Sequence, residues 1–127
     1  CLGMQLLFEK SYEYGEHAGL GLLRGCVVPM EGKLPPELKI PHIGWNALRF
    51  QKPSALFRNI SDGDCVYFVH SYYAADCAGS VIATTEYGID LTAAVEQGNV
   101  KGCQFHPEKS GRVGLNILRA FCEGEPV

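Results

Sequence analysis

The sequence has 127 residues, with 11 Lys and Arg against 14 Asp and Glu and a formal net charge of −3. This length fits one domain, and 46% hydrophobic with 20% charged residues is typical of a globular chain, which excludes disorder throughout. The chain has no basic cluster, which argues against nucleic acid or an anionic membrane as its partner, and its apolar runs are too short to span a bilayer.

The first half of the chain predicts one helix, two strands and a long loop. Residues 2–13 predict a short helix, because apolar residues recur on one face. They are Met4, Leu7 and Phe8. Residues 26–28 predict a strand, residues 29–41 a loop rich in proline, and residues 42–50 a further strand.

The second half predicts more strands and a final helix. Turn residues at 60–64 precede an apolar run at 65–69, which reads as a strand buried on both faces, as in parallel α/β sheets. Residues 81–85 predict another strand, and residues 91–105 a hairpin that turns at Gln97-Gly98-Asn99. Ser110 predicts the start of a helix, with one apolar stripe. The stripe is Val113, Ile117 and Phe121, joined by Leu118 and Cys122.

The six cysteines do not predict a metal site, because none forms Cys-x-x-Cys and no histidine lies at zinc-site spacing from them. Four of them lie inside apolar runs, where a free cysteine behaves as a small core residue. They are Cys26, Cys65, Cys103 and Cys122. The pattern favours reduced thiols in the cytosol, with a disulfide framework as the alternative.

Two segments carry residue types suited to nucleophilic catalysis. Cys1 lies at the first turn of the predicted helix, where unpaired N–H groups and the helix dipole favour the nucleophilic thiolate. In His106-Pro107-Glu108 the proline keeps the backbone extended, so that His106 and Glu108 point the same way. Glu108 can then fix the tautomer of His106. Taken separately, Cys1 also fits a truncation point, and the His–Glu pair also fits an ordinary surface contact.

Considered together, Cys1, His106 and Glu108 predict a specific kind of catalysis. A cysteine, a distant histidine and an orienting carboxylate form the general arrangement for covalent acyl transfer. Ser71 and Tyr72 follow the strand predicted to be buried, and ligands of parallel α/β sheets bind just beyond the carboxyl ends of strands. Their backbone is therefore predicted to face a substrate, with an ordinary turn as the alternative.

Four stretches resemble the class I, triad-type glutamine amidotransferases, in order along the whole chain. They are residues 1–8, 41–46, 67–72 and 102–110. Cys-Leu-Gly-x-Gln with a downstream His-Pro-Glu is fairly specific for that family, whereas Pro-His-x-Gly-Trp-Asn and Phe-His-Pro-Glu-Lys-Ser are most similar to the glutaminase subunits of imidazole glycerol phosphate synthase, from histidine biosynthesis. The resemblance implies an α/β fold over residues 1–127: the C-terminal portion of the family's flavodoxin-like domain, with a mixed sheet flanked by helices.

The resemblance implies a glutaminase with a Cys-His-Glu triad. Cys1 would attack the side-chain amide carbon of glutamine, His106 would accept the thiol proton and pass one to the leaving ammonia, and Glu108 would orient His106. The Leu2 N–H matches one oxyanion donor. Positions that match the family's contacts with glutamine are Gln5, Glu13 and the backbone of Ser71 and Tyr72.

The resemblance also implies a partner, which is the (β/α)8-barrel cyclase that receives the ammonia. Residues that match the partner-binding face are Trp45, Asn46, Tyr67 and Lys109. No cofactor, metal, nucleic acid or membrane is implied, and a cytoplasmic location is expected. Individually, Trp45 would also suit a core anchor and Lys109 a solvated charge.

The start of the chain departs from the family pattern. There the nucleophile lies on a sharp elbow between a strand and a helix, within Gly-x-Cys-x-Gly, and only Gly3 of these glycines is present here. We therefore expect the first strands and helices of the domain, with one oxyanion donor, to be missing. Loss of one donor costs about 10²–10³ in rate, so the isolated chain is expected to be inactive.

Three other functions fit parts of the sequence. Another class I amidotransferase would share the triad. A class II type amidohydrolase would use the α-amine of Cys1 as its base, although His106 would then have no role. A non-catalytic interaction module would dock a partner through the region of Trp45 and Tyr67.

Overall fold

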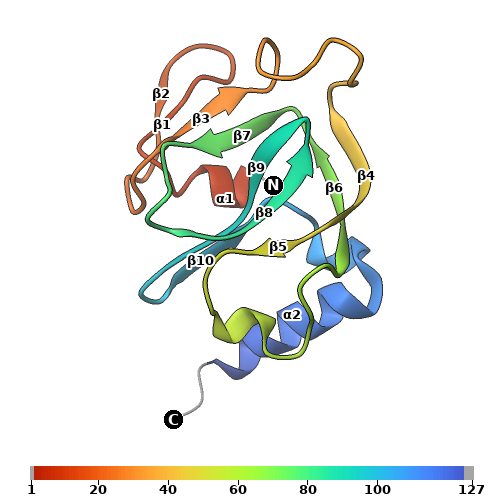
Figure 1. Cartoon of the computed structure of the whole chain (residues 1–127). Helices are drawn as coiled ribbons and strands as arrows, with labels where there is room; N and C mark the ends of the chain where they lie inside the picture. Colours follow the sequence, from red (N-terminus) through yellow and green to blue (C-terminus); the bar gives the residue numbers. More distant parts are fainter. Residues whose placement is uncertain (1, 125–127) are drawn as a thin grey trace.

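Strands dominate the computed structural model of the chain, which describes residues 2–124 without the side chain of Leu2 (Figure 1). In chain order the elements, with η for a 3₁₀ turn, are α1 (Leu2–Gln5), β1 (Lys10–Ser11), β2 (His17–Ala18), β3 (Cys26–Pro29), β4 (His42–Ala47), β5 (Arg49–Phe50), η1 (Ala55–Phe57), β6 (Cys65–His70), β7 (Tyr72–Ala75), β8 (Val81–Tyr87), β9 (Ile89–Gln97), β10 (Val100–Cys103), η2 (Pro107–Lys109) and α2 (Gly111–Glu123).

The described strands form one mixed and two antiparallel sheets. The mixed sheet has the order β2-β1-β3-β7, with β1 and β3 parallel. The second sheet has the order β10-β9-β8-β5, and β4 pairs with β6 alone. α2 lies along one end of the molecule, below β5 and β10 in the view of Figure 1. The mixed sheet and flanking helices of the predicted α/β class are present, although most of the pairing is antiparallel.

The helix predicted over residues 2–13 is wrong beyond Gln5, where α1 ends. The Glu9 N–H donates to the Gly25 carbonyl at 3.0 Å, and the Tyr12 N–H donates to the Val27 carbonyl at 2.9 Å. The Glu9 carboxylate in turn accepts the Gly25 N–H at 3.0 Å. These bonds to a segment far along the chain replace the helical ones, which local periodicity cannot reveal.

The strand predicted at 65–69 exists as β6, but its burial on both faces is wrong. Its residues alternate between buried and more exposed positions, and its antiparallel partner β4 leaves one face open. The strand buried on both faces is β9, in which residues 91–95 are all buried. Small side chains there, Ala93 and Ala94 among them, let neighbouring layers approach closely.

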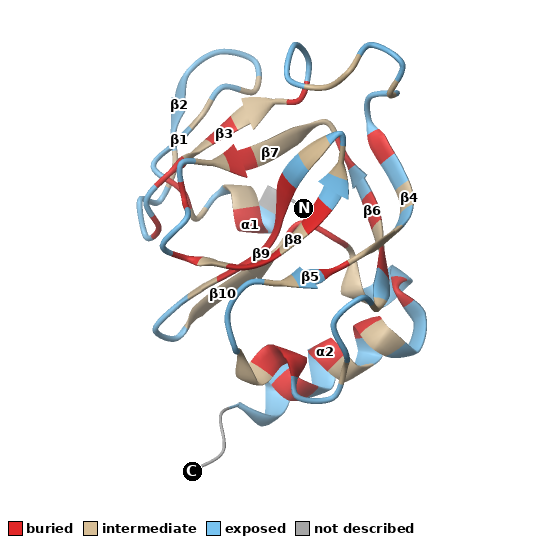
Figure 2. Ribbon diagram, in the orientation of Figure 1, coloured by how far each residue is buried: buried red, intermediate tan, exposed pale blue. Residues whose placement is uncertain are grey.

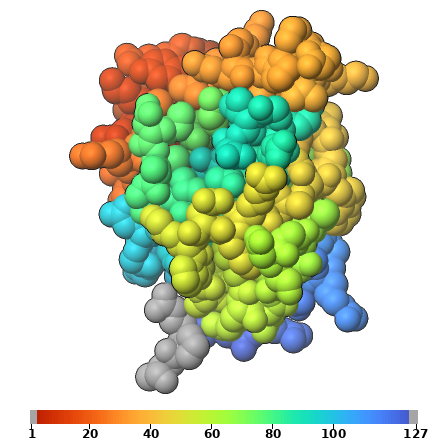
Figure 3. Space-filling model, viewed as in Figure 1, coloured from red at the N-terminus to blue at the C-terminus, as the bar shows by residue number. Residues whose placement is uncertain are grey.

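The remaining predicted strands and loops are confirmed. β3, β8 and the β9–β10 hairpin lie where expected, and the predicted strand at 42–50 is divided into β4 and β5 at Leu48. Residues 30–41 form a loop without helix or strand, seen in orange at the top of Figure 3. Gly88 joins β8 to β9 at φ 79°, a backbone conformation that favours glycine.

The helix predicted after Ser110 is confirmed as α2, but its buried face differs from the expected stripe (Figure 2). The buried residues are Gly114, Ile117 and Ala120. Phe121 is 55% exposed and Leu115 is 63% exposed, so α2 keeps a second, uncovered apolar face.

Two hydrophobic clusters make up the core. One joins η1, β6, β8 and β9 to α2, and the other joins α1 to β3, β7 and β9. The five described cysteines are free thiols, but Cys65 and Cys122 are exposed, contrary to the expectation that they pack in the core. Within residues 2–124 no group of three or more potential ligands could hold a metal ion, and no helix is long and apolar enough to cross a membrane.

Candidate active site

His106 and Glu108 form a hydrogen-bonded pair just after β10. The distance from His106 Nδ1 to Glu108 Oε1 is 2.9 Å. His106 itself is extended, but the 3₁₀ turn η2 brings Glu108 back toward the ring, so the contact arises from a turn rather than from the extended segment predicted. Because a carboxylate can only accept, Nδ1 carries the proton of the neutral ring and Nε2 is left as the base.

Electrostatics around Glu108 favour its charged form. The Glu108 carboxyl has a pKa below its ordinary value, first because of its own backbone N–H and then because of the His106 ring. An ionised Glu108 keeps the proton on Nδ1 and stabilises the imidazolium that forms when Nε2 takes a proton. The pair can therefore act as a general base with a fixed orientation.

Ser110 holds the backbone of His106 against β6. The His106 N–H donates to the Tyr67 carbonyl at 3.0 Å, and Ser110 Oγ donates to the His106 carbonyl at 2.6 Å. Ser110 Oγ also accepts the Tyr67 N–H at 2.9 Å. Ser110 is 1% exposed, and its hydroxyl links His106 to Tyr67 and does not cap α2 as the sequence suggested.

Gln5 joins α1 to the segment that carries His106. Gln5 Nε2 donates to Gln104 Oε1 at 3.2 Å and to the Tyr72 carbonyl at 3.3 Å. Gln104 is fully buried two residues before His106, and sequence reasoning missed it. The available signal was a polar residue inside the apolar run from Cys103 to Phe105.

The predicted glutamine contacts are only partly brought together. Gln5 and Tyr72 are in contact, and the adjacent Ser71 carbonyl is occupied by the Met30 N–H at 3.0 Å. Glu13 lies in the turn after β1, where its N–H bonds to Ser11 Oγ at 3.3 Å. No hydrogen bond or ion pair within residues 2–124 joins the Glu13 carboxylate to Gln5, Ser71 or Tyr72.

The predicted nucleophile, Cys1, lies outside the described residues. The backbone of Leu2, the predicted oxyanion donor, begins α1, whose last residue is Gln5. Gln5 thus ties the helix following Cys1 to the neighbourhood of His106 by a hydrogen bond.

An apolar face lies on the outer side of β4 and β6. Trp45 is 58% exposed, and its ring meets the Tyr67 ring edge-on, with centroids 6.0 Å apart. Ile43 and Val69, which were not predicted, are paired next to them and are also exposed. Trp45 also approaches Gly111, the first residue of α2, just beyond η2. The four side chains, Ile43, Trp45, Tyr67 and Val69, are called the β4–β6 face below.

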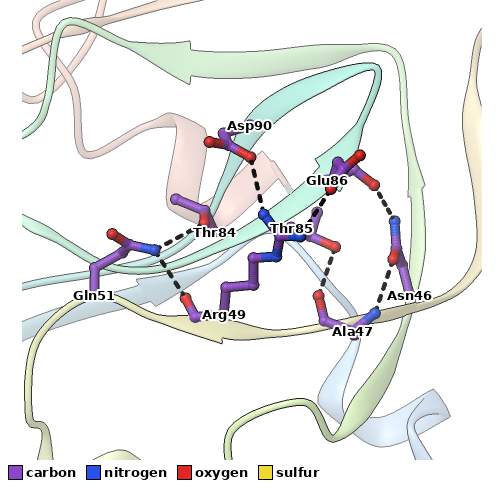
Figure 4. Close-up of polar contacts among 8 residues, drawn as sticks. All are labelled: Asn46, Ala47, Arg49, Gln51, Thr84, Thr85, Glu86 and Asp90. Carbon is purple, nitrogen blue, oxygen red and sulfur yellow. Dashed lines mark hydrogen bonds and ion pairs between the residues drawn. The ribbon is translucent and has the colours of Figure 1, made fainter.

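The other two predicted interface residues lie apart from this face. Asn46 points to the opposite side of β4 from Trp45, because side chains alternate along a strand. Its Nδ2 donates to the Glu86 carbonyl at 2.8 Å, and its Oδ1 accepts the Ala47 N–H at 2.8 Å (Figure 4). Lys109 is exposed at the end of η2, next to Glu108.

Comparison with known proteins finds one matching family and several similar proteins. The family described as glutamine amidotransferase class-I matches residues 1–123. A protein of Lactiplantibacillus plantarum named imidazole glycerol phosphate synthase subunit HisH is 54% identical over 125 residues, which are 97% of this chain and 58% of that protein. The protein of the same name in Aquifex aeolicus is 52% identical over 122 residues, covering 95% of this chain and 57% of that protein. The chain thus spans somewhat over half the length of these relatives.

A solved structure shows the same fold. The crystal structure of a putative GMP synthase protein from Thermoplasma acidophilum superposes with a TM-score of 0.60, covering 78% of this chain and 47% of that one. At 17% sequence identity, the likeness concerns the fold alone.

Proposed function

This chain belongs to the class-I glutamine amidotransferase family, and we propose that residues 1–127 are the C-terminal part of the glutaminase domain of imidazole glycerol phosphate synthase, in histidine biosynthesis. Relatives that bear the name of its HisH subunit, at 50% identity and above, support this choice over another class I amidotransferase. The activity would be hydrolysis of glutamine to glutamate and ammonia.

The chemistry uses three side chains. His106 Nε2 takes the proton of the Cys1 thiol, and the sulfur attacks the amide carbon of glutamine, whose developing oxyanion the Leu2 N–H stabilises. The imidazolium, held by Glu108, then gives its proton to the leaving ammonia, and a γ-glutamyl thioester remains. Water, deprotonated by Nε2, attacks the thioester and releases glutamate and the thiol.

One observation carries the proposal: the 2.9 Å bond between His106 Nδ1 and Glu108 Oε1, which leaves Nε2 as a base. The bond between Gln5 and Gln104 supports it, because it ties the helix that follows Cys1 to the strand end that presents His106. A surface histidine without a catalytic role would not need the Glu108 contact. Nor would it need the Ser110 clamp, the pair of hydrogen bonds by which the buried Ser110 hydroxyl holds the His106 carbonyl and the Tyr67 N–H.

Glutamine would be held next to this pair. Gln5 would bind glutamine, and the backbone of Ser71 and Tyr72 would bind its α-carboxylate. Glu13 would also contact glutamine, after a movement of the turn that follows β1. The contact of Gln5 with the Tyr72 carbonyl supports the grouping.

The partner would be the (β/α)8-barrel cyclase, in a cytoplasmic heterodimer without a cofactor. We propose that it docks on the β4–β6 face together with Lys109, with Asn46 behind that face. An exposed apolar surface beside a catalytic pair suits a partner that must take up ammonia before water protonates it. The same face would serve a non-catalytic docking module, so the test must separate binding from turnover.

The test uses the complete glutaminase with its cyclase partner. Cys1→Ala and His106→Ala should each abolish glutamine-dependent synthesis, whereas ammonia-dependent synthesis by the partner and binding of the partner should persist. Cys122→Ala, which removes an exposed thiol on α2, is the matched control and should keep both activities. Retention of glutamine turnover in either triad variant would overturn the mechanism, and partner binding without turnover in the unmodified protein would favour the docking module.

A further inference from the structure

Two buried histidines outside the proposed triad face each other across β4 and β6. His42 and His70 are paired in register, and they are 3% and 7% exposed. His42 Nδ1 lies 3.0 Å from His70 Nε2, and His70 Nδ1 lies 2.9 Å from the Tyr72 carbonyl oxygen. At its other side, His42 Nε2 lies 3.3 Å from Asn46 Nδ2. A continuous line of polar atoms thus runs from Asn46 to Tyr72.

The chemistry of the end groups fixes the direction of every bond in this line. The Tyr72 carbonyl can only accept, so His70 Nδ1 carries a proton, and Nε2 of the neutral ring must accept. His42 Nδ1 must then donate to it, which leaves His42 Nε2 to accept from the Asn46 amide. Both rings are therefore neutral Nδ1–H tautomers, because a proton on His70 Nε2 would face the proton on His42 Nδ1.

Burial suits this neutral state. Desolvation lowers the pKa of both rings from 6.5 to about 4. The His42 ring also contacts two aromatic rings: it stacks on Phe68 with centroids 4.9 Å apart, and it is tilted against Tyr87 with centroids 4.2 Å apart. Phenylalanine would fill such a site without buried polar atoms that need partners. The deduced hydrogen-bond directions therefore give these imidazoles a role that a phenylalanine ring could not fill.

The Asn46 end of the line is fixed by its surroundings. The same Nδ2 donates to the Glu86 carbonyl, and Oδ1 accepts the Ala47 N–H, as Figure 4 shows. The buried Thr85 hydroxyl donates to the Ala47 carbonyl at 2.8 Å, which ties β8 to the end of β4. Asn46 is also the neighbour in sequence of Trp45, whose ring lies on the β4–β6 face.

The Tyr72 end lies at the proposed glutamine site. The Tyr72 carbonyl accepts from two side chains, His70 Nδ1 and Gln5 Nε2. Because His70 is two residues before Tyr72, its bond closes a short loop around the Ser71–Tyr72 peptide. That peptide is the one proposed to hold the α-carboxylate of glutamine.

We propose that His42 and His70 are positioning residues, which hold the Ser71–Tyr72 peptide in place for glutamine and connect it through Asn46 to the strand that bears the partner-binding face. The inference rests on the proposed function for the identity of the ligand. A displacement of β4 during docking would be transmitted to the Tyr72 carbonyl through the three hydrogen bonds Asn46–His42, His42–His70 and His70–Tyr72. The partner would not need to contact the substrate.

The first test reads the tautomers directly and does not depend on activity. In the complete glutaminase, ¹⁵N NMR of the imidazoles should show both His42 and His70 protonated at Nδ1 and unprotonated at Nε2. A through-hydrogen-bond ¹⁵N–¹⁵N coupling should join His42 Nδ1 to His70 Nε2. An Nε2–H tautomer on either ring, or absence of the coupling, would overturn the line of bonds.

The second test separates positioning from packing. His70→Phe keeps a buried ring but removes the donor to Tyr72, so KM for glutamine should rise about fivefold, the factor that corresponds to one neutral hydrogen bond, with little change in kcat. His70→Asn, whose Nδ2–H takes the place of Nδ1–H, should restore most of the loss. His17→Phe, at an exposed histidine on β2, is the matched control.

The double variant tests the connection itself. If both rings act in one line, His42→Phe should raise KM by itself, and adding it to His70→Phe should cost nothing further. Ammonia-dependent synthesis by the partner should be unchanged in all variants. An unaltered KM in a folded His70→Phe protein, or additive effects, would refute the inference, whereas an unmodified protein without glutamine turnover would refute the proposed function instead.

Discussion

Ser110 is the residue whose role the sequence described least well, since its hydroxyl serves His106 rather than the helix that it precedes. Ser110→Ala removes the donor to the His106 carbonyl and the acceptor for the Tyr67 N–H. Buried polar groups left unpaired cost about 1–3 kcal/mol each, so the free energy of unfolding should fall. The released His106 should lower kcat for glutamine more than it raises KM.

Chemical denaturation and steady-state kinetics of the complete glutaminase check this expectation. Ser61→Ala, which removes the hydroxyl of an exposed serine in the turn before β6, is the control and should change neither quantity. A Ser110→Ala protein with normal kcat would mean that the clamp does not position the imidazole.

The buried histidine pair makes stability depend on pH in a defined window. The folded-state pKa of His42 and His70 is about 4, below the ordinary value of 6.5. Their contribution to the free energy of unfolding is therefore fully present above pH 6.5. As the pH falls from 6.5 toward 4, the unfolded chain binds protons that the folded chain excludes, so stability is lost by up to about 1.4 kcal/mol per pH unit for each ring.

Urea unfolding across that window measures the slope. The double variant His42→Phe, His70→Phe removes both titrating rings and should flatten it. An equally steep slope in the double variant would assign the acid sensitivity to other groups.

At the scale of elements, α2 approaches η2 closely because Gly114 has no side chain. A Cβ at this position would lie 1.9 Å from the Pro107 carbonyl oxygen and 2.8 Å from Ser110 Cβ. Gly114→Ala must therefore shift α2 or η2, and we expect a loss of about 3 kcal/mol, at the upper end of the usual cost of overpacking. Glutamine turnover should fall as well, because His106 and Glu108 flank Pro107.

Gly79→Ala is the matched control, since a Cβ there would meet nothing within 4 Å. Thermal unfolding of both variants compares the two costs. Equal stability of Gly114→Ala and Gly79→Ala would show that α2 can move away from η2 without loss.

Elements also show where sequence patterns succeed. β3, β8, the β9–β10 hairpin and the start of α2 were predictable because turn residues and local apolar patterns define them. The end of α1 and the faces of β6 and β9 were not, because distant partners decide them. The partners are the Gly25 and Val27 carbonyls for the segment after Gln5, and the layers on either side for β9. Likewise, the exposure of Phe121 depends on which side of α2 meets the sheets.

At the scale of the whole molecule, residues 1–127 should be insufficient for catalysis by themselves. The relatives are longer, since the match covers only 57–59% of the first of them. If the proposed domain assignment is right, the elbow strand and one oxyanion donor lie outside these residues, and one donor is worth about 10²–10³ in rate.

A glutaminase assay on the purified 127-residue chain checks this point. Its rate should not exceed that of the same chain with Cys1→Ala. A measurable rate that depends on Cys1 would contradict the domain assignment while leaving the triad chemistry standing.

The sequence by itself determined the family and which histidine and carboxylate would be partners, because short motifs keep those residue types at fixed spacing, although the turn that pairs them was not predicted. Only the tertiary structure decided what surrounds them. The bonds of Tyr67 with Ser110, of Gln5 with Gln104 and of His42 with His70 join residues 28 to 99 positions apart in the sequence. Hydrogen bonds depend on where donors and acceptors meet in space, and that is set by how the layers pack rather than by any local pattern.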